Sequence, residues 1–92
     1  MTEQSLVLVQ IENNSYFTNK TYLFETRSYI TEDCKYATVN TERGVQFGRI
    51  VGFVSKYHRN EDVDNALMKA TGATLPLKKV ISLYREEICD NE

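Results

Sequence analysis

The sequence has few metal-binding residues, no long apolar run and no excess of positive charge. One histidine and two distant cysteines, Cys34 and Cys89, cannot provide the ligand spacing of a structural zinc site. No run of about 18 apolar residues is present, so neither a transmembrane helix nor a membrane partner is expected. The formal net charge is −2, so nucleic-acid binding would need a local basic patch.

The N-terminal residues also lack the features of an export signal. They read MTEQSLVLVQIENN, with no basic leader and with a short apolar run that Gln10 interrupts. We therefore expect a cytoplasmic protein with reduced thiols and without a cofactor. The length fits one domain over residues 1–92, in which residues 85–92 form a frayed, solvating tail.

Short runs of apolar and β-branched residues occupy most of the chain and indicate strands. These runs cover residues 6–11, 21–26, 35–41 and 45–54. Gly44 follows the polar residues 41–43, which predicts a hairpin loop with glycine at a positive φ. Gly48 and Gly52 are followed by strand-forming residues rather than by a helix. They therefore indicate bends in a barrel strand, not a phosphate-binding loop.

The period of the apolar residues changes after residue 59. Asn60 can cap a helix, acidic residues follow it, and Gly72 is a suitable stop, so a helix near residues 61–71 is predicted. Residues 77–88 fit either a second helix or a closing strand. The need to pair the open edge of the sheet favours the strand. The chain is thus expected to be mainly β: a small β-barrel of about five antiparallel strands with one short helix.

The segment CKYATVNTERGVQFGRIVGFV resembles a strand–turn–strand unit in the C-terminal domain of the polymerase-suppressor protein family. The matching positions are Val39, Thr41, Glu42, Arg43, Gly44, Val45, Gly48, Arg49, Ile50 and Val51. The segment is also similar to small proteins of bacteriophages and mobile elements, in which strands like YLFET and KKVISL flank the same unit. Members usually carry a Gly-Asp pair where this chain has residues 32–35. The resemblance implies an SH3-like barrel and transfers no catalytic residue.

A second, shorter likeness concerns the KOW motif of ribosomal and transcription-factor barrels. It rests on Val39, Gly44, Gly48 and Val51. This likeness keeps nucleic acid among the expected partners.

Basic and aromatic residues provide the functional lead. Residues 43–59 hold four formal positive charges and no acid, and we refer to them as the basic strip. Its candidate binding residues are Arg43, Arg49, Lys56, Tyr57, His58 and Arg59. Such a strip can contact phosphates and stack a base, or it can consist of ordinary surface cations.

No residue pattern indicates catalysis. His58 has no recognisable triad partner, and the acids before Cys34 do not favour a reactive thiolate. Six tyrosines and four phenylalanines exceed what a small core buries, so some are expected on a partner-binding surface. We therefore expect a non-catalytic binding module that acts as a protein-interaction accessory factor. The resemblance implies that this factor is of phage or mobile-element type. The alternative is a nucleic-acid-binding barrel that uses the basic strip, and the oligomeric state stays open.

Overall fold

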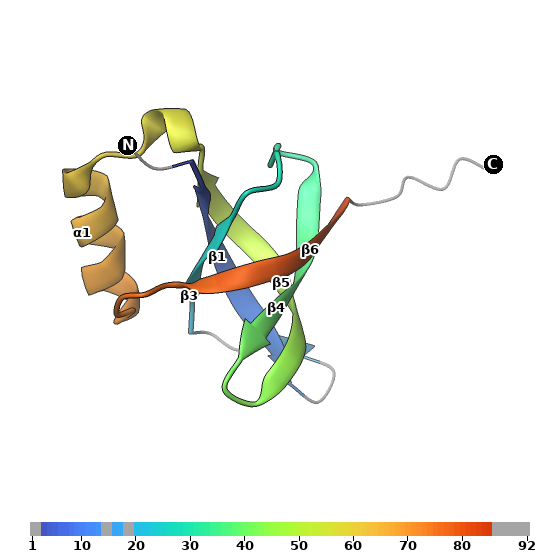
Figure 1. Cartoon of the computed structure of the whole chain (residues 1–92). Helices are drawn as coiled ribbons and strands as arrows, with labels where there is room; N and C mark the ends of the chain where they lie inside the picture. Colours follow the sequence, from blue (N-terminus) through green and yellow to red (C-terminus); the bar gives the residue numbers. More distant parts are fainter. Residues whose placement is uncertain (1–2, 14–15, 18–19, 86–92) are drawn as a thin grey trace.

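In the part of the chain that the structure describes, six strands, one 3-10 helix and one α-helix make up the fold. The computed structural model describes residues 3–13, 16–17 and 20–85, so residues 86–92 of the expected tail lie outside the described part. The strands are β1 (Ser5–Asn13), β2 (Tyr16–Phe17), β3 (Tyr22–Thr26), β4 (Cys34–Thr41), β5 (Gly44–Val54) and β6 (Lys78–Arg85). The 3-10 helix η1 (Lys56–His58) and the helix α1 (Glu61–Thr71) connect β5 to β6. Figure 1 shows α1 on one side of the barrel.

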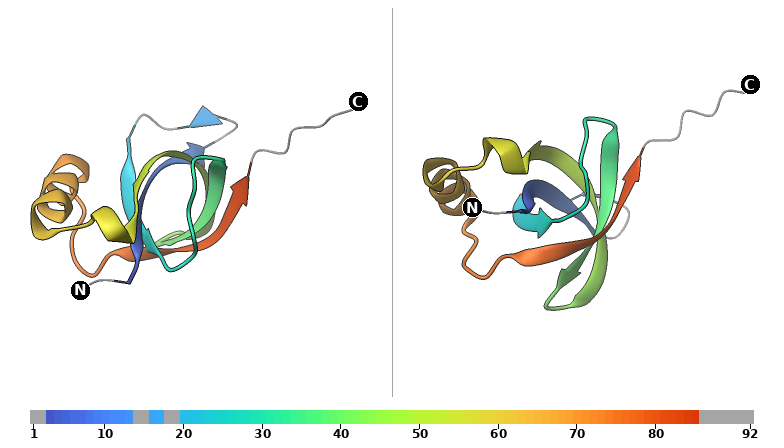
Figure 2. Two further views of the ribbon diagram at one scale, coloured as in Figure 1. Left: turned by 90° about the horizontal axis from the view of Figure 1, so that it is seen from above. Right: turned by 45° about the horizontal axis from the view of Figure 1, so that its top comes forward.

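Five strands form a closed ring in the order β1–β3–β6–β4–β5, and β5 pairs back with β1 (Figure 2). The expected small β-barrel with one short helix is therefore confirmed. The expectation of antiparallel strands is wrong for one pair, because β3 and β6 run parallel. A closed ring with an odd number of strands cannot alternate its direction all the way round. At least one neighbouring pair must be parallel, and here it is β3–β6.

The local signals for turns and helix ends are confirmed at their predicted positions. Gly44 has a φ of 98° in the hairpin between β4 and β5. The side chain of Asn60 accepts a hydrogen bond from the Val63 amide, and Gly72 ends α1 with a φ of 75°. The ambiguous C-terminal segment is strand from Lys78 to Arg85, as the pairing argument favoured.

Two apolar clusters hold the barrel and the helix. The first lies inside the ring and consists of Val7, Val9, Ile11, Phe24, Ile30, Cys34, Ala37 and Val39. The second joins α1 to the outside of the barrel, where Leu67 and Met68 pack against Leu6, Leu23 and Leu77. Because no residue of α1 is fully buried, the helix depends on this second cluster and on polar contacts for its position.

Candidate functional site

The predicted basic strip does not form one continuous surface. Arg43 lies at the β4–β5 hairpin, whereas Lys56, Tyr57 and His58 belong to η1 at the other end of β5 (Figure 1). The 11 residues of β5 separate these groups by roughly 35 Å of extended chain. The cations of the strip are therefore spread along one long strand rather than gathered in a patch.

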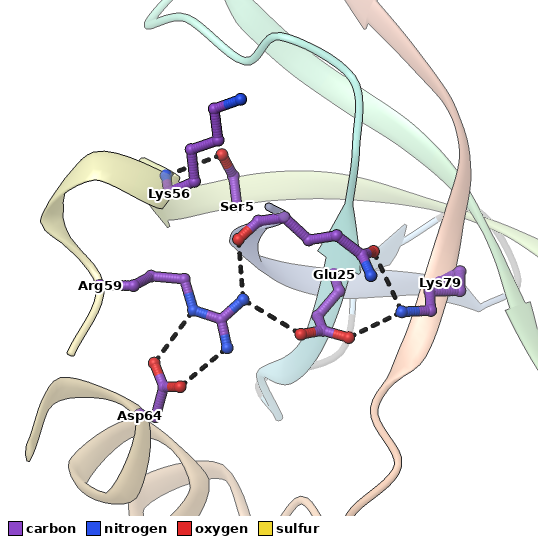
Figure 3. Close-up of polar contacts among 7 residues, drawn as sticks. Ser5, Glu25, Lys56, Arg59, Asp64 and Lys79 are labelled. Atoms are coloured by element: carbon purple, nitrogen blue, oxygen red, sulfur yellow. Dashed lines mark hydrogen bonds and ion pairs between the residues drawn. The ribbon is translucent and has the colours of Figure 1, made fainter. Parts of the chain in front are cut away.

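Arg59 is built into the fold. Its side chain is only 6% exposed, and its Nε and Nη2 donate to the Asp64 carboxylate at 3.1 and 2.8 Å. Its Nη1 donates to the Gln4 carbonyl oxygen at 2.7 Å and to Glu25 Oε2 at 3.0 Å (Figure 3). Two carboxylates thus offset the guanidinium charge. Asp64 also raises the pKa of Arg59. Through these contacts, the guanidinium group of Arg59 links α1 to the barrel.

The same network also connects β3 and β6, the parallel pair of strands that closes the ring. Glu25 of β3 and Lys79 of β6 are paired in register, and Lys79 Nζ donates to Glu25 Oε1 at 2.7 Å (Figure 3). Lys79 also donates to Gln4 Oε1 at 3.0 Å. Since β3 and β6 share only two residue pairs, these side-chain contacts reinforce the place where the ring closes.

The pKa of Glu25 lies below the ordinary glutamate value. Burial alone would raise this pKa, but hydrogen bonds from Lys79 and Arg59, together with their charges, lower it. A carboxylate whose folded-state pKa is lowered adds stability above its unfolded-state pKa. That stability is lost as the pH falls through the lowered value.

We expect the unfolding free energy of the wild type to fall more steeply with acid than that of Glu25→Gln. The difference should appear below about pH 4.5, the ordinary pKa of glutamate, and continue through the lowered pKa of Glu25. Urea unfolding at a series of pH values measures it. Asp33, whose pKa the hydrogen bond from Thr31 lowers, contributes acid sensitivity to both proteins. Equal slopes in the two proteins would contradict the role of the network.

The outer side of β4, β5 and β6 carries an apolar surface that shares Val45, Phe47 and Arg49 with the basic strip. Tyr36 of β4 stacks on Phe47 of β5, with ring centroids 5.4 Å apart and planes 19° from parallel. Tyr36 is also in register with Arg49 on one side and with Tyr84 on the other. We call this surface the aromatic face. Its members are Tyr36, Val45, Phe47, Arg49, Ile81 and Tyr84.

The aromatic face combines exposed apolar side chains with one cation. Phe47 is 38% and Tyr84 46% exposed, and Val45 and Ile81 are more exposed still. None of the strands β4, β5 and β6 contains an aspartate or glutamate. Arg49 Nε donates to Gln10 Oε1 at 2.9 Å, which holds its side chain against the neighbouring strand β1. The face thus presents aromatic and aliphatic side chains together with one arginine.

The sequence indicated surplus aromatics but not where they meet. Tyr36, Phe47 and Tyr84 come from three strands, and 48 positions separate the first from the last. Only the pairing of β6 with β4 brings Tyr84 beside Tyr36. Alternation along each strand could have marked each residue as outward-facing, but the strand order was needed to gather them.

Comparison with family models, with curated proteins and with solved structures found no match for this chain. The resemblance to the polymerase-suppressor family and the SH3-like assignment therefore stay predictions. Within residues 3–13, 16–17 and 20–85, no helix is long and apolar enough to cross a membrane. In the same part of the chain, no three His, Cys, Asp or Glu residues gather as metal ligands.

Proposed function

We propose that this chain is a non-catalytic protein-binding module that contacts its partner through the aromatic face. The observation that carries this proposal is the stack of half-buried Tyr36 on exposed Phe47, beside exposed Tyr84 and on strands without acids. Aromatic residues and arginine are enriched at the centres of protein interfaces, whereas lysine and acids are depleted there. The resemblance to small phage and mobile-element proteins suggests the setting, an accessory factor that docks on a host or phage protein.

Nucleic acid is the second candidate, and one observation favours it. Arg49 lies in register with Tyr36, and an arginine beside stacked aromatics is typical of single-strand binding surfaces. Against this, Arg59 is neutralised by Glu25 and Asp64. Arg43 and Lys56 lie at opposite ends of β5. The cations needed to follow a phosphate backbone are therefore not side by side, and a protein partner fits the surface better.

We expect Phe47→Ser and Tyr84→Ser to weaken partner binding at least tenfold, which corresponds to about 1.4 kcal/mol, because each removes an aromatic anchor from the interface. The tagged chain is used to capture proteins from nuclease-treated cell extract, and the affinity of the purified partner is then measured. Tyr57→Ser is the matched control, since Tyr57 is 78% exposed but lies on η1. Circular dichroism and thermal melting establish that all variants fold.

Unchanged binding by the two aromatic-face variants would contradict the proposal. If Phe47→Ser captures the same proteins as the wild type, the aromatic face is not the interface. Mixed-sequence single-stranded DNA and RNA are tested at about 50 mM salt, where phosphate contacts are strongest, and no binding is expected. Binding that Arg49→Ala abolishes would instead support the nucleic-acid alternative.

A further inference from the structure

The pairing of β3 with β6, which closes the ring, covers only the first residues of β6. β3 and β6 pair only through Phe24 with Lys78 and Glu25 with Lys79. β3 then ends at Thr26, while β6 continues to Arg85. In Figure 1 the two strands lie together near α1 and then diverge. Among the residues that the structure describes, none pairs with residues 80–85 on the side facing away from β4.

Residues 27–33 follow β3 but do not pair with residues 80–85 of β6. Residues 27–33 contain no strand, and Ile30 turns inward to join the apolar cluster inside the ring. Between this segment and β6 lies a hollow. It is lined by Ser28, Tyr29, Cys34, Leu83, Tyr84 and Arg85. The edge of β6 is thus accessible and has space beside it for a side chain.

We propose that the partner adds an extended segment of its own chain as a further strand along residues 80–85 of β6, an inference that rests on the proposed protein-binding function. In such strand addition, backbone hydrogen bonds supply affinity, and pockets beside the edge select alternate side chains. The hollow at Leu83 receives one side chain of the segment. Ile81 and Tyr84 belong to the aromatic face, so an added strand continues that face without a break.

The charge of β6 indicates which segment fits. The strand carries Lys78 and Arg85 near its two ends and no acid, whereas the ammonium group of Lys79 is already paired with Glu25. A second copy of β6 would bring further cations and no acid to this edge, so it offers no opposite charge to Lys78 or Arg85. Arg85 is 61% exposed and its 3.5 Å contact with Asp33 is long, so it stays accessible to an incoming carboxylate. The occupant is therefore an apolar β-forming segment with acidic residues at its ends.

Two synthetic peptides test this inference on the full chain. Each alternates valine and threonine over the length of residues 80–85, and the ends carry aspartates in one peptide and lysines in the other. Amide hydrogen exchange is followed by NMR at up to about 1 mM peptide, which detects even weak association. We expect the aspartate peptide to slow exchange in β6 and to shift the resonances of Tyr29 and Leu83. We expect the lysine peptide to bind at least tenfold more weakly.

A charge-swapped chain is the matched variant. Lys78→Glu combined with Arg85→Glu changes exposed side chains at the ends of β6, and should reverse the preference between the peptides. Unchanged exchange in residues 80–85 with both peptides would overturn the inference, as would self-association of the chain through β6 in analytical ultracentrifugation. Loss of capture by Phe47→Ser with unchanged β6 exchange overturns strand addition alone. If Phe47→Ser captures the same proteins as the wild type, the aromatic-face proposal itself is contradicted.

Discussion

Arg59→Ala is expected to lower the free energy of unfolding by about 3 kcal/mol, because it leaves partly buried carboxylates without their central partner. Asp64 loses both of its hydrogen bonds from the guanidinium, and Glu25 keeps only Lys79. The link between α1 and the start of β1 is broken as well, since Arg59 also binds the Gln4 carbonyl. Urea unfolding followed by circular dichroism measures the change.

Arg43→Ala is the matched control for this prediction. Both residues belong to the basic strip, but Arg43 is exposed at the hairpin tip and forms no ion pair with any carboxylate in the described part of the chain. Its removal should change the unfolding free energy by no more than about 0.5 kcal/mol. If the two variants are equally stable, Arg59 is an ordinary surface cation and the network does not hold α1 and the barrel together.

Gly48→Ala is expected to destabilise the fold by about 3 kcal/mol, at the upper end of the cost of overpacking. Gly48 is buried and in register with both Ala37 and Ile11, so it lies where β5 has strands on both sides. A Cβ there would lie 2.5 Å from Val9 Cγ1 and 2.7 Å from the Gln10 carbonyl oxygen. Because the oxygen belongs to a backbone paired within the ring, relief requires β1 itself to move.

Gly52→Ala provides the comparison on the same strand. Its Cβ would come no closer than 3.3 Å, to Leu8 Cδ1 at the end of a flexible side chain. We expect a cost below about 1 kcal/mol, because Leu8 can shift slightly to make room. Thermal and urea unfolding of both variants show whether the cost comes from the steric clash at Gly48. The alternative is a loss of strand flexibility, which both substitutions would cause equally. Equal effects would show that the close approach at Gly48 is not what matters.

Local patterns in the sequence were sufficient for most elements of the fold. Gly44, Asn60 and Gly72 mark ends that neighbouring residues determine, and all three occupy the predicted positions. The strand from Lys78 was ambiguous by periodicity, and the need to cover an open edge identified it. The parallel pair was missed because it depends on which strands are neighbours in the closed ring, and no single segment reveals this order. β2 and η1 were missed because each is too short to show a period.

The site was harder to predict than the fold because it depends on contacts between distant segments. Arg59 was grouped with the other cations of residues 43–59. Its partner Glu25 lies 34 positions earlier, and its partner Asp64 was counted only among the acidic residues that follow Asn60. The stacking of Tyr36 on Phe47 follows from the register of β4 and β5, which the hairpin at Gly44 sets. Charge counted along the chain therefore suggested a basic surface where the folded protein presents an apolar one.

The most direct measurement compares partner affinity for two single substitutions, Phe47→Ser on the aromatic face and Arg43→Ser at the hairpin tip of the basic strip. Both are made in the full chain and tested by titration against the purified partner, at low and at high salt. We expect Phe47→Ser to weaken binding at least tenfold, and Arg43→Ser to leave it within about twofold at both salt concentrations. Binding that survives Phe47→Ser but is lost in Arg43→Ser or at high salt would contradict a protein-binding role for the aromatic face.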